Sequence, residues 1–599
     1  MATKVNDFVL NIATANGSGS QSSNNVIVRS LFRMGIPATG KNLFPSNISG
    51  LPTWFTIRAN PQGFTAHCKE NDIVVAMNPA SAIDDINSIP KGGYLILNDA
   101  IKVTDDQLRK DIEIIKVPFK KLVDGITKTA KLKKLLINMV YVGVLARLLD
   151  IDKDVIKKVV SDMFKFKASV VESNILAITT GYKWAGENLD HTHFPYKTKT
   201  IPDGNKDKII VDGNTATALG WLFGGCTFIA WYPITPSSSI AESFYKYAEK
   251  YRKDEDGNNK VAVVQAEDEL SSINMVTGAG WAGARAATAT SGPGVSLMAE
   301  AVGLSYFAEI PAVIVDVQRG GPSTGLPTRT QQSDLLSVAT LSHGDTRHVV
   351  LLPNNPIECF EFSQASFDLA ERIQTPVFML TDLDIGMQQW VSDDFNYPEK
   401  PFDRGKVLSP AELNKMEDWG RYKDMDGDRI PYRTLPGTDH PRASYLTRGT
   451  GHDPSANYSE NPEVYRKLLD RLAQKYEAAK QYVPVPILDK MNGAKHGILA
   501  YGSTDSAIPE IRHLLNEKGL KTNYLRLRAL PFTKEVGEFF EIHEKVFVIE
   551  QNRDAQLATL LKDVHPEYHT KLVSILQYDG MPVTPATLAQ EIANKEKLV

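Results

Sequence analysis

The segment from residue 209 to residue 390 alternates short apolar runs with helical stretches, and this pattern constrains the fold more than any other feature of the chain. The apolar runs are TFIAWY (227–232), VAVVQAE (261–267), AATAT (286–290), AVIVDVQ (312–318), VVLLP (349–353) and PVFMLTD (376–382). Strands that are apolar along their whole length are buried on both faces, as in parallel sheets covered by helices. The segment is therefore predicted to be a doubly wound α/β domain.

Two other blocks show the same alternation. Residues 1–199 contain five strand-like runs and a long helical stretch over most of 132–188, and a linker at 198–208 follows them. Residues 491–599 alternate strand-like and helical runs again, which predicts a second small doubly wound domain. With 599 residues, the chain is expected to be a multidomain α/β protein with doubly wound parallel sheets.

The block from 391 to 490 differs from its neighbours. It is polar, rich in Pro, Gly and Asp, and has little periodicity before Asn461. A structureless segment of this length is unusual inside a compact protein. We therefore expect an ordered insertion or arm that wraps around another part of the protein.

Composition excludes several functions. The net charge of −4 gives no basic surface for nucleic acid or for a membrane. The N-terminus shows no charged-then-apolar signal pattern. The longest apolar stretch (135–151) is interrupted by Asn138, Arg147 and Asp150, which indicates a buried helix rather than a membrane span. We expect a cytoplasmic protein.

The three cysteines, Cys68, Cys226 and Cys359, form no CxxC pair. An iron–sulfur cluster usually needs four thiolates. We therefore expect no cluster on this chain, and the cysteines are predicted to be small buried apolar residues.

Ligands of open parallel sheets bind beyond the carboxyl ends of the strands, so the loops after the strands of 209–390 are where chemistry is expected. After the first strand, Thr235 lies between two prolines before a helix whose free N–H groups could bind an anion. Simple capping of the helix is the alternative. After the second strand come Glu267, Asp268 and Glu269, before a helix of small residues that a cofactor could approach closely. Acidic residues there would also simply favour the helix dipole.

The third and fourth strands are followed by glycine-rich loops. SGPG (291–294) precedes a helix, and the stretch 319–329 carries Arg319 and Arg329 among glycines. The planar fork of arginine matches a carboxylate, so Arg319 is a candidate for binding an oxoacid; a surface salt bridge is the alternative for either arginine. The four loops should meet at one edge of the sheet, which fits an organic acid together with a cofactor that needs a carboxylate.

Three stretches resemble a known family. They are YPITPSS (232–238), EDELSS (267–272) continuing to GAGWAGARAATATSGPG (278–294), and DVQRGGPSTGLPTRTQQSDL (316–335). They are similar to the pyrimidine-binding domain of 2-oxoacid:ferredoxin oxidoreductases, above all to the α subunit of 2-oxoglutarate:ferredoxin oxidoreductase with an N-terminally fused γ domain. The resemblance implies a γ domain (1–199), a pyrimidine-binding-type domain (209–390), an insertion (391–490) and a transketolase C-terminal-like domain (491–599).

The resemblance also implies an activity. The family decarboxylates a 2-oxoacid on thiamine pyrophosphate, passes electrons through iron–sulfur clusters to ferredoxin and transfers the acyl group to coenzyme A. The implied reaction is 2-oxoglutarate to succinyl-CoA, with the reverse direction also open. Pyruvate or another 2-oxoacid is an alternative substrate. A non-catalytic scaffold and a transketolase-like enzyme without redox chemistry are the alternative functions.

The remaining parts of the active site are implied to lie on a β subunit, which would bind the pyrophosphate, its magnesium ion and the iron–sulfur cluster. The present chain has no GDG motif followed by paired asparagines, since DGNN (256–259) lacks the leading glycine. The missing motif agrees with the scarcity of cysteine. An (αβ)2 heterotetramer is implied, because the cofactor would lie between chains.

The resemblance assigns roles to single residues. Glu269 falls where the family has a glutamate that hydrogen-bonds the aminopyrimidine ring and promotes its imino tautomer; Glu267, two residues away, is the alternative register. Such a carboxylate needs a buried environment. Thr235 and Arg319 fall at positions that contact the substrate's keto and carboxylate groups. Arg329 is a candidate for the distal carboxylate of a dicarboxylic substrate, and the γ domain is associated with access of coenzyme A.

The stretch DMDGDRI (424–430) looks like the start of a calcium-binding loop. Its glycine falls at the fourth rather than the sixth position, and Leu435 stands where the loop needs a glutamate. A tight Asp/Gly turn is the favoured interpretation, so no metal is expected here.

Overall fold

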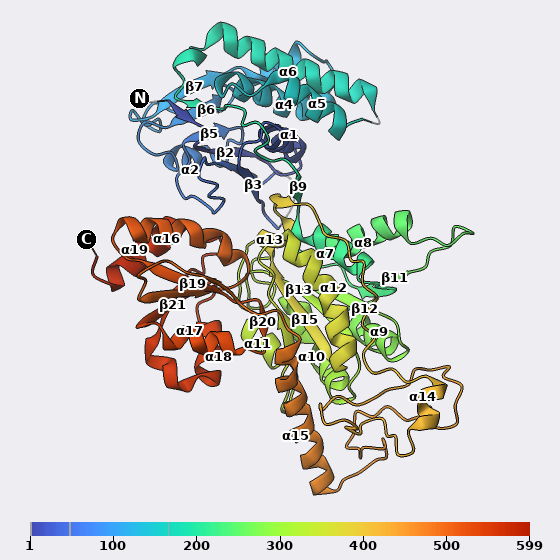
Figure 1. Cartoon of the computed structure of the whole chain (residues 1–599). Coiled ribbons are helices and arrows are strands. Elements are labelled where there is room, and N and C mark those ends of the chain that lie inside the picture. Colours follow the sequence, from blue (N-terminus) through green and yellow to red (C-terminus); the bar gives the residue numbers. More distant parts are fainter. Residues whose placement is uncertain (1–2, 47–49, 166, 599) are drawn as a thin grey trace. The chain divides into compact units, whose positions relative to one another are not determined.

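The computed structural model describes residues 3–46, 50–165 and 167–598, and the chain forms two compact units. The first unit comprises residues 1–211, 388–394 and 584–587, and the second comprises 212–387, 395–583 and 588–599 (Figure 1). Both consist of sheets with packed helices, which confirms the predicted multidomain α/β class. Within the described ranges, no helix combines the length and the apolar character needed to cross a membrane.

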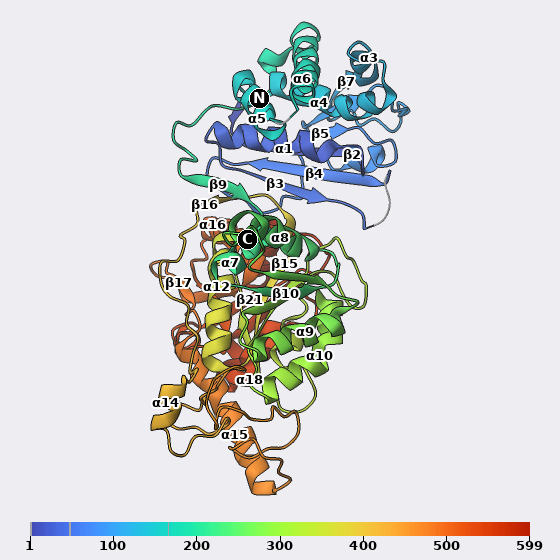
Figure 2. The same ribbon diagram turned by 90° about the vertical axis from the view of Figure 1, so that its right-hand side faces the viewer.

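A six-stranded sheet forms the first unit, in the order β3-β4-β2-β5-β6-β7. Its strands are β2 (Phe8–Ala15), β3 (Ala38–Leu43), β4 (Pro52–Ala59), β5 (Ile73–Ala76), β6 (Tyr94–Asn98) and β7 (Glu113–Val117). Strands β2, β5, β6 and β7 are parallel. At one edge, β4 pairs antiparallel with β2, and β3 pairs antiparallel with β4 (Figure 2). The polar β3, ATGKNL, has no strand-like pattern of apolar residues. It pairs with β4 along its whole length, so backbone pairing decides its conformation rather than side-chain propensity.

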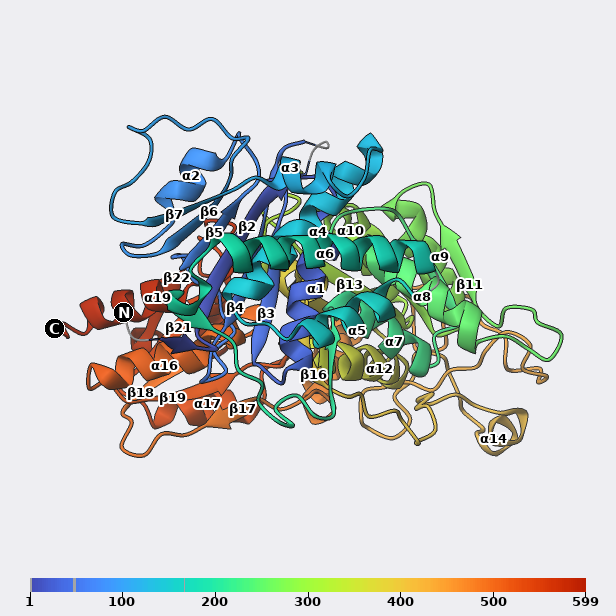
Figure 3. The same cartoon turned by 90° about the horizontal axis from the view of Figure 1, so that it is seen from above.

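The helices of this unit are α1 (Ser20–Arg33), α2 (Ala82–Asn87), α3 (Phe119–Asp124), α4 (Ala130–Leu148), α5 (Lys153–Met163) and α6 (Ala168–Asn188). Helices α4 and α6 run side by side (Figure 3). A Cβ atom at Gly143 would lie 2.0 Å from the carbonyl oxygen of Ile178, and one at Gly181 would lie 2.1 Å from that of Val140. Glycine at both positions therefore allows the two backbones to touch. The buried helix predicted over 135–151 is confirmed, because most of α4 from Leu136 onward is inaccessible.

Two short ladders complete the first unit. One joins β1 (Lys4–Val5) to β8 (Tyr196–Lys197). The other joins β9 (Lys208–Val211) to β16 (Trp390–Asp393) in antiparallel register. The first residues after 390 thus belong to the first unit, and the described arm begins beyond them.

The second unit contains a seven-stranded sheet in the order β11-β10-β12-β13-β15-β14-β20. Its strands are β10 (Phe228–Trp231), β11 (Ala262–Gln265), β12 (Ala286–Thr290), β13 (Ala312–Gln318), β14 (Val349–Leu351), β15 (Pro376–Asp382) and β20 (Ala529–Leu530). The first six are mutually parallel, as predicted for 209–390. The last, β20, comes from the C-terminal block and is antiparallel to β14.

A second sheet, in the order β17-β19-β18-β21-β22, comes from the C-terminal block. Its strands are β17 (Ile487–Asp489), β18 (His496–Ala500), β19 (Thr522–Arg526), β21 (Lys545–Glu550) and β22 (Leu572–Leu576). Phe378 and Leu380 of β15 share one hydrophobic core with Leu499 and Tyr501. The two sheets of this unit therefore form one packed body.

Helices cover both sheets of the second unit. They are α7 (Gly213–Phe223), α8 (Ser238–Tyr251), α9 (Glu269–Trp281), α10 (Gly292–Phe307), α11 (Leu335–Ala339), α12 (Pro356–Ile373), α13 (Leu383–Met387), α14 (Pro410–Lys415), α15 (Pro462–Ala478), α16 (Ile508–Glu517), α17 (Lys534–Glu541), α18 (Gln556–Val564) and α19 (Pro585–Lys595).

The polar arm between β16 and β17 is ordered, with α14 and α15 as its helices (Figure 2). Its α15 is held by the fully buried Glu309, which follows α10: the Lys475 ammonium lies 2.7 Å from one carboxylate oxygen, and Arg471 is a second partner. A second buried carboxylate, Glu371, binds the arm residues Arg404 and Arg433. The arm therefore wraps its own unit, as expected for this block.

Replacing Lys475 by Met should loosen the arm, because Glu309 would keep its buried charge with one cation fewer. Breaking a buried ion pair of this kind costs about 3 kcal/mol. We expect faster cleavage of residues 395–460 in limited proteolysis and a lower melting temperature. Lys467→Met is the matched control, since Lys467 lies exposed on the same helix. Equal protease resistance of both variants would contradict the anchoring role of Lys475.

Candidate active site

The loops singled out in the sequence meet at one edge of the seven-stranded sheet. Strands β11, β10, β12 and β13 are neighbours and parallel, so their carboxyl ends emerge on the same side. In register, Trp231 at the end of β10 pairs with Gln265, and Thr290 at the end of β12 pairs with Asp316. The predicted convergence of the four loops is confirmed.

Glu269 is the first residue of α9, and only 6% of it is exposed. The preceding Asp268 caps the helix by accepting a hydrogen bond of 2.7 Å from the backbone N–H of Ser271. This cap fixes the direction in which the helix starts, and with it the Glu269 side chain. Glu267 is exposed. Of the two glutamates, Glu269 thus has the buried environment expected for the cofactor-binding carboxylate.

Gly294, at the start of α10, leaves the space that Glu269 occupies. A Cβ atom at this position would lie 2.7 Å from Cγ and 3.0 Å from Oε1 of Glu269, and 2.0 Å from the hydroxyl of Thr290. In addition, the fully buried hydroxyl of Ser291 has no hydrogen-bond partner among the described residues. A flat, polar heterocyclic ring fits this environment. It would meet the buried carboxylate of Glu269, the backbone of Gly294 and the unsatisfied hydroxyl of Ser291.

Arg319 connects the loops with each other. It directly follows β13, is 7% exposed, and donates a hydrogen bond of 2.6 Å to the backbone oxygen of Thr235. Burial lowers the pKa of Arg319, while the carboxylates of Asp334, Asp316 and Glu269 oppose this shift. Its Nε atom is buried and has no partner within the described part of the chain. The guanidinium therefore keeps donor capacity for an anion.

Thr235 lies half-buried in the turn between β10 and α8, at a cis bond to Pro236. Asn214 holds this turn by donating to the Pro236 oxygen and to Ser239, both at 2.8 Å. Thr235 contacts Arg319 through its backbone oxygen. The structure thus brings Thr235, Arg319 and Glu269 into one region, while their roles toward substrate and cofactor stay predictions.

Arg329 is placed differently. The loop folds back on itself, because Leu326 donates to the Gly320 oxygen at 2.7 Å and Gly320 donates to the Arg329 oxygen at 3.0 Å. The loop is therefore less free than its glycines indicate. The Arg329 side chain packs beside Gly580 and donates to the Thr328 oxygen at 2.9 Å.

An open cleft of about 880 Å³ adjoins Arg319. Its walls come from the loops after β12 and β13 and from the C-terminal domain, and they include Gly292, Ser323, Asp334, Arg553 and Tyr578. Among the described residues, its lining includes Arg319 but not Glu269, Thr235 or Arg329. The cleft thus reaches Arg319 from one side, while Arg329 lies outside the lining.

Comparison with known proteins identifies the family to which the chain belongs. Residues 220–394 match the family described as "Pyruvate flavodoxin/ferredoxin oxidoreductase, thiamine diP-bdg", and residues 9–184 match "Pyruvate ferredoxin/flavodoxin oxidoreductase". The α subunit of 2-oxoacid:ferredoxin oxidoreductase 2 from Aeropyrum pernix is 30% identical over 641 residues, which cover 96% of each chain. The chain belongs to the 2-oxoacid:ferredoxin oxidoreductase family.

Two further relatives are similar over most of the chain. The 2-oxoglutarate oxidoreductase subunit KorA of Mycobacterium tuberculosis is 30% identical over 560 residues, covering 88% of this chain and 82% of its own. A solved 2-oxoglutarate:ferredoxin oxidoreductase from Magnetococcus marinus, with 2-oxoglutarate, coenzyme A and succinyl-CoA bound, has a TM-score of 0.87 at 27% identity and covers 98% and 99% of the two chains. The present chain is therefore the α subunit of a thiamine-pyrophosphate-dependent, multi-subunit oxidoreductase.

Two acidic residues of this α subunit escaped the sequence interpretation. Asp316 lies inside β13 and is fully buried, and Asp334 lies at the start of α11. Burial, followed by the charge of Asp334, raises the pKa of Asp316 well above its usual value. Burial also raises the pKa of Asp334 to about 6. The signal was available in the sequence, since an aspartate interrupts the otherwise apolar run AVIVDV.

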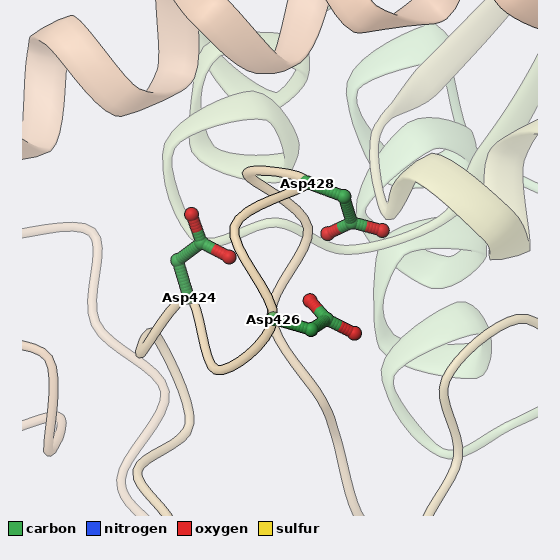
Figure 4. A group of neighbouring side chains, drawn as sticks. All are labelled: Asp424, Asp426 and Asp428. Atoms are coloured by element: carbon green, nitrogen blue, oxygen red, sulfur yellow. The ribbon is translucent and has the colours of Figure 1, made fainter.

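The arm of the α subunit carries a cluster of three aspartates, Asp424, Asp426 and Asp428 (Figure 4). The Lys406 ammonium lies 2.7 Å from Asp426 and 2.6 Å from Asp428, and Arg429 pairs with Asp424. The protein itself thus supplies the positive charge between these groups. The predicted tight turn is confirmed, because the Gly427 N–H donates to Asp424 at 2.8 Å in a left-handed conformation.

Gly294→Ala should displace Glu269, because the added Cβ cannot fit beside its Cγ atom. Overpacking at such a site costs about 1–3 kcal/mol, so we expect a lower melting temperature and a large loss of turnover in the assembled enzyme. Gly278→Ala on α9 is the control: its Cβ would meet no atom within 4 Å, and helix propensity should stabilise it by about 0.5–1 kcal/mol. A Gly294→Ala enzyme with unchanged turnover would contradict the placement of Glu269.

Proposed function

We propose that this α subunit takes part in the oxidative decarboxylation of 2-oxoglutarate to succinyl-CoA. Two electrons leave the substrate one at a time for ferredoxin, CO2 is released, and the acyl group goes to coenzyme A. The reverse direction, reductive carboxylation of succinyl-CoA, uses the same site. The observation that carries the proposal is the buried Arg319, whose guanidinium joins the loop of Thr235 to the region of Glu269 and still has a free donor.

The residues of this chain have separate tasks in the proposal. Thiamine pyrophosphate, when bound, supplies the carbon nucleophile that attacks the keto group. The Glu269 carboxylate would accept a hydrogen bond from the cofactor's aminopyrimidine ring and so hold a proton there, in a pocket from which water is excluded. Arg319 would bind the substrate carboxylate, and Thr235 would orient the keto group beside it.

For the other parts of the enzyme, family membership supports the following proposal. A β subunit would bind the pyrophosphate, the magnesium ion and the iron–sulfur cluster, and two copies of each chain would form an (αβ)2 heterotetramer in the cytoplasm. Residues 1–199 would act as the γ domain through which coenzyme A reaches the site. The four-part division at 199, 390 and 490 belongs to this proposal.

Substrate choice has a second candidate. Several relatives are named for 2-oxoacids in general, and the matching family descriptions refer to pyruvate, which favours a broad or pyruvate-specific enzyme. The 2-oxoglutarate proposal is supported by the relatives whose names specify that substrate. Arg329 is a weaker part of it, because its guanidinium donates to its neighbour Thr328 and lies outside the cleft lining.

A panel of 2-oxoacids tests the substrate. In the co-expressed complex, prepared without oxygen and supplied with coenzyme A and a one-electron acceptor, we expect a strong preference for 2-oxoglutarate. Arg319→Lys should raise KM for every 2-oxoacid, since a lysine cannot bind a carboxylate bidentately. Arg329→Lys should raise KM for 2-oxoglutarate alone. A preference for pyruvate, or an unchanged KM in Arg329→Lys, would contradict the proposed binding of a distal substrate carboxylate by Arg329.

Glu269→Gln tests the catalytic role of the chain. The amide cannot act as the acceptor that general acid–base chemistry needs, so turnover should fall by about 100-fold or more while the complex still assembles. Glu267→Gln makes the same chemical change at an exposed position two residues earlier and should keep most of the activity. Little change of turnover in Glu269→Gln would favour the scaffold function. Loss of turnover in Glu267→Gln alone would make Glu267, rather than Glu269, the cofactor-binding glutamate.

A further inference from the structure

Asp316 is a carboxylic acid in the interior of the protein, within the otherwise apolar strand β13. It lies in the middle of β13, is fully buried, and has Thr290 and Leu380 as its register partners on the two adjacent strands. Neither of its oxygens has a hydrogen-bond donor among the described residues. An isolated, ionised carboxylate is very costly in such a place. Asp316 therefore needs either a cation or a proton.

Asp334 lies between this buried group and the cleft. Its backbone N–H donates to Gln318 at 3.1 Å, which holds the start of α11 against the end of β13. Gly292 leaves room for the Asp334 side chain, since a Cβ atom there would lie 2.8 Å from its Oδ2. That Oδ2 is buried and also has no donor in the described ranges. Asp334 lines the same cleft as Arg319.

The two carboxyl groups satisfy each other if they share a proton. They are within hydrogen-bonding contact, and burial raises the pKa of both. Two like charges so close cannot both ionise easily, so the first proton is lost near pH 6 and the second at a higher pH. At neutral pH the pair thus holds one proton, with Asp316 as the neutral partner and a negative charge next to the cleft.

The charged groups around the pair determine what this charge acts on. Arg319, at the end of β13, is the cation that lowers the pKa of both aspartates, and Glu269 of α9 also acts on Arg319. Burial raises the pKa of Tyr501, and the nearby carboxylates of Glu550, Asp382, Asp334 and Asp316 raise it further. These groups are neutral or negative, so Arg319 is the cation among the described residues that offsets the charge of the pair.

We propose that Asp316 and Asp334 are a proton-sharing positioning pair for Arg319, which takes up a proton when the carboxylate of a 2-oxoacid binds to that arginine. This inference rests on the proposed role of Arg319. A bound substrate carboxylate shares the guanidinium with the pair and adds negative charge to the cleft. A proton from solvent then forms an O–H bond on Asp334 and removes the repulsion. Anion binding and protonation of the pair thus favour each other.

The sign of the pH dependence follows from this linkage. Below about pH 6 the pair is already protonated and does not repel the substrate; as pH rises through about 6, the proton has to be taken up on binding. KM for 2-oxoglutarate should therefore rise with pH above 6, at most about tenfold per pH unit because one proton is involved. The substrate carboxylates are fully ionised in this range and do not contribute.

The test is the pH profile of KM in the assembled complex, measured between about pH 6 and 8 with 2-oxoglutarate, coenzyme A and a one-electron acceptor. In the native enzyme KM should rise with pH. In Asp334→Asn, which cannot carry the charge, KM should be flat and lower than native at the alkaline end. Asp579→Asn is the matched control: its exposed carboxylate lines the same cleft and accepts a hydrogen bond from the Met581 N–H, and the variant should keep the rising profile.

A second measurement does not depend on the folding of any variant. Titration calorimetry of the native complex with 2-hydroxyglutarate, in two buffers of different ionisation enthalpy, should show uptake of a fraction of a proton per bound ligand. A KM of the native enzyme that does not change with pH would contradict the proton-sharing role of Asp316 and Asp334. A KM that still rises with pH in Asp334→Asn would contradict it as well. An unchanged KM in Arg319→Lys would instead overturn the role of Arg319 itself, and so identify the proposed function as the part that failed.

Discussion

The burial of Arg319 among carboxylates is the interaction on which this site depends. A guanidinium that is 7% exposed is tolerated only where hydrogen bonds and opposite charges replace water. The Thr235 oxygen supplies the hydrogen bond, and Glu269 together with the Asp316–Asp334 pair supplies the opposing charge. Because these groups lie on separate segments of the chain, namely the turn before α8, strand β13 and the starts of α9 and α11, the segments can take up this arrangement only together. The same arrangement leaves one donor unused, which is what an anionic substrate requires.

The parallel sheet makes that arrangement possible. Neighbouring strands of a parallel sheet deliver their carboxyl ends to one edge, so residues far apart in sequence meet without long connections. Glycines then admit groups that a side chain would exclude: Gly294 admits Glu269, and Gly292 admits Asp334. Such positions explain why the loops of this chain carry glycines beside single charged residues. The small residues leave the space, and the charged residues act in it.

The polar arm illustrates a second use of buried charge. Glu309 and Glu371 lie in the core of the second unit and bind cations that the arm provides, among them Lys475 and Arg433. Most of this segment lacks apolar periodicity, so its hydrophobic burial is limited to small clusters such as Leu408 with Leu413 and Leu468 with Leu472. Buried ion pairs with hydrogen bonds can hold it, and they also fix its register. This explains how a polar block with little regular structure remains ordered.

The sequence by itself determined the α/β class, the parallel sheet of 209–390, the loops that carry the site and the family. These depend on local patterns, namely apolar runs, glycines and charged residues at strand ends. The tertiary structure alone decided which glutamate is buried, that β20 crosses to the larger sheet, that Arg329 lies outside the cleft lining, and that Asp316 meets Asp334. Each of these depends on contacts between distant segments and on exclusion of water, and neither can be read from the order of residues along a chain.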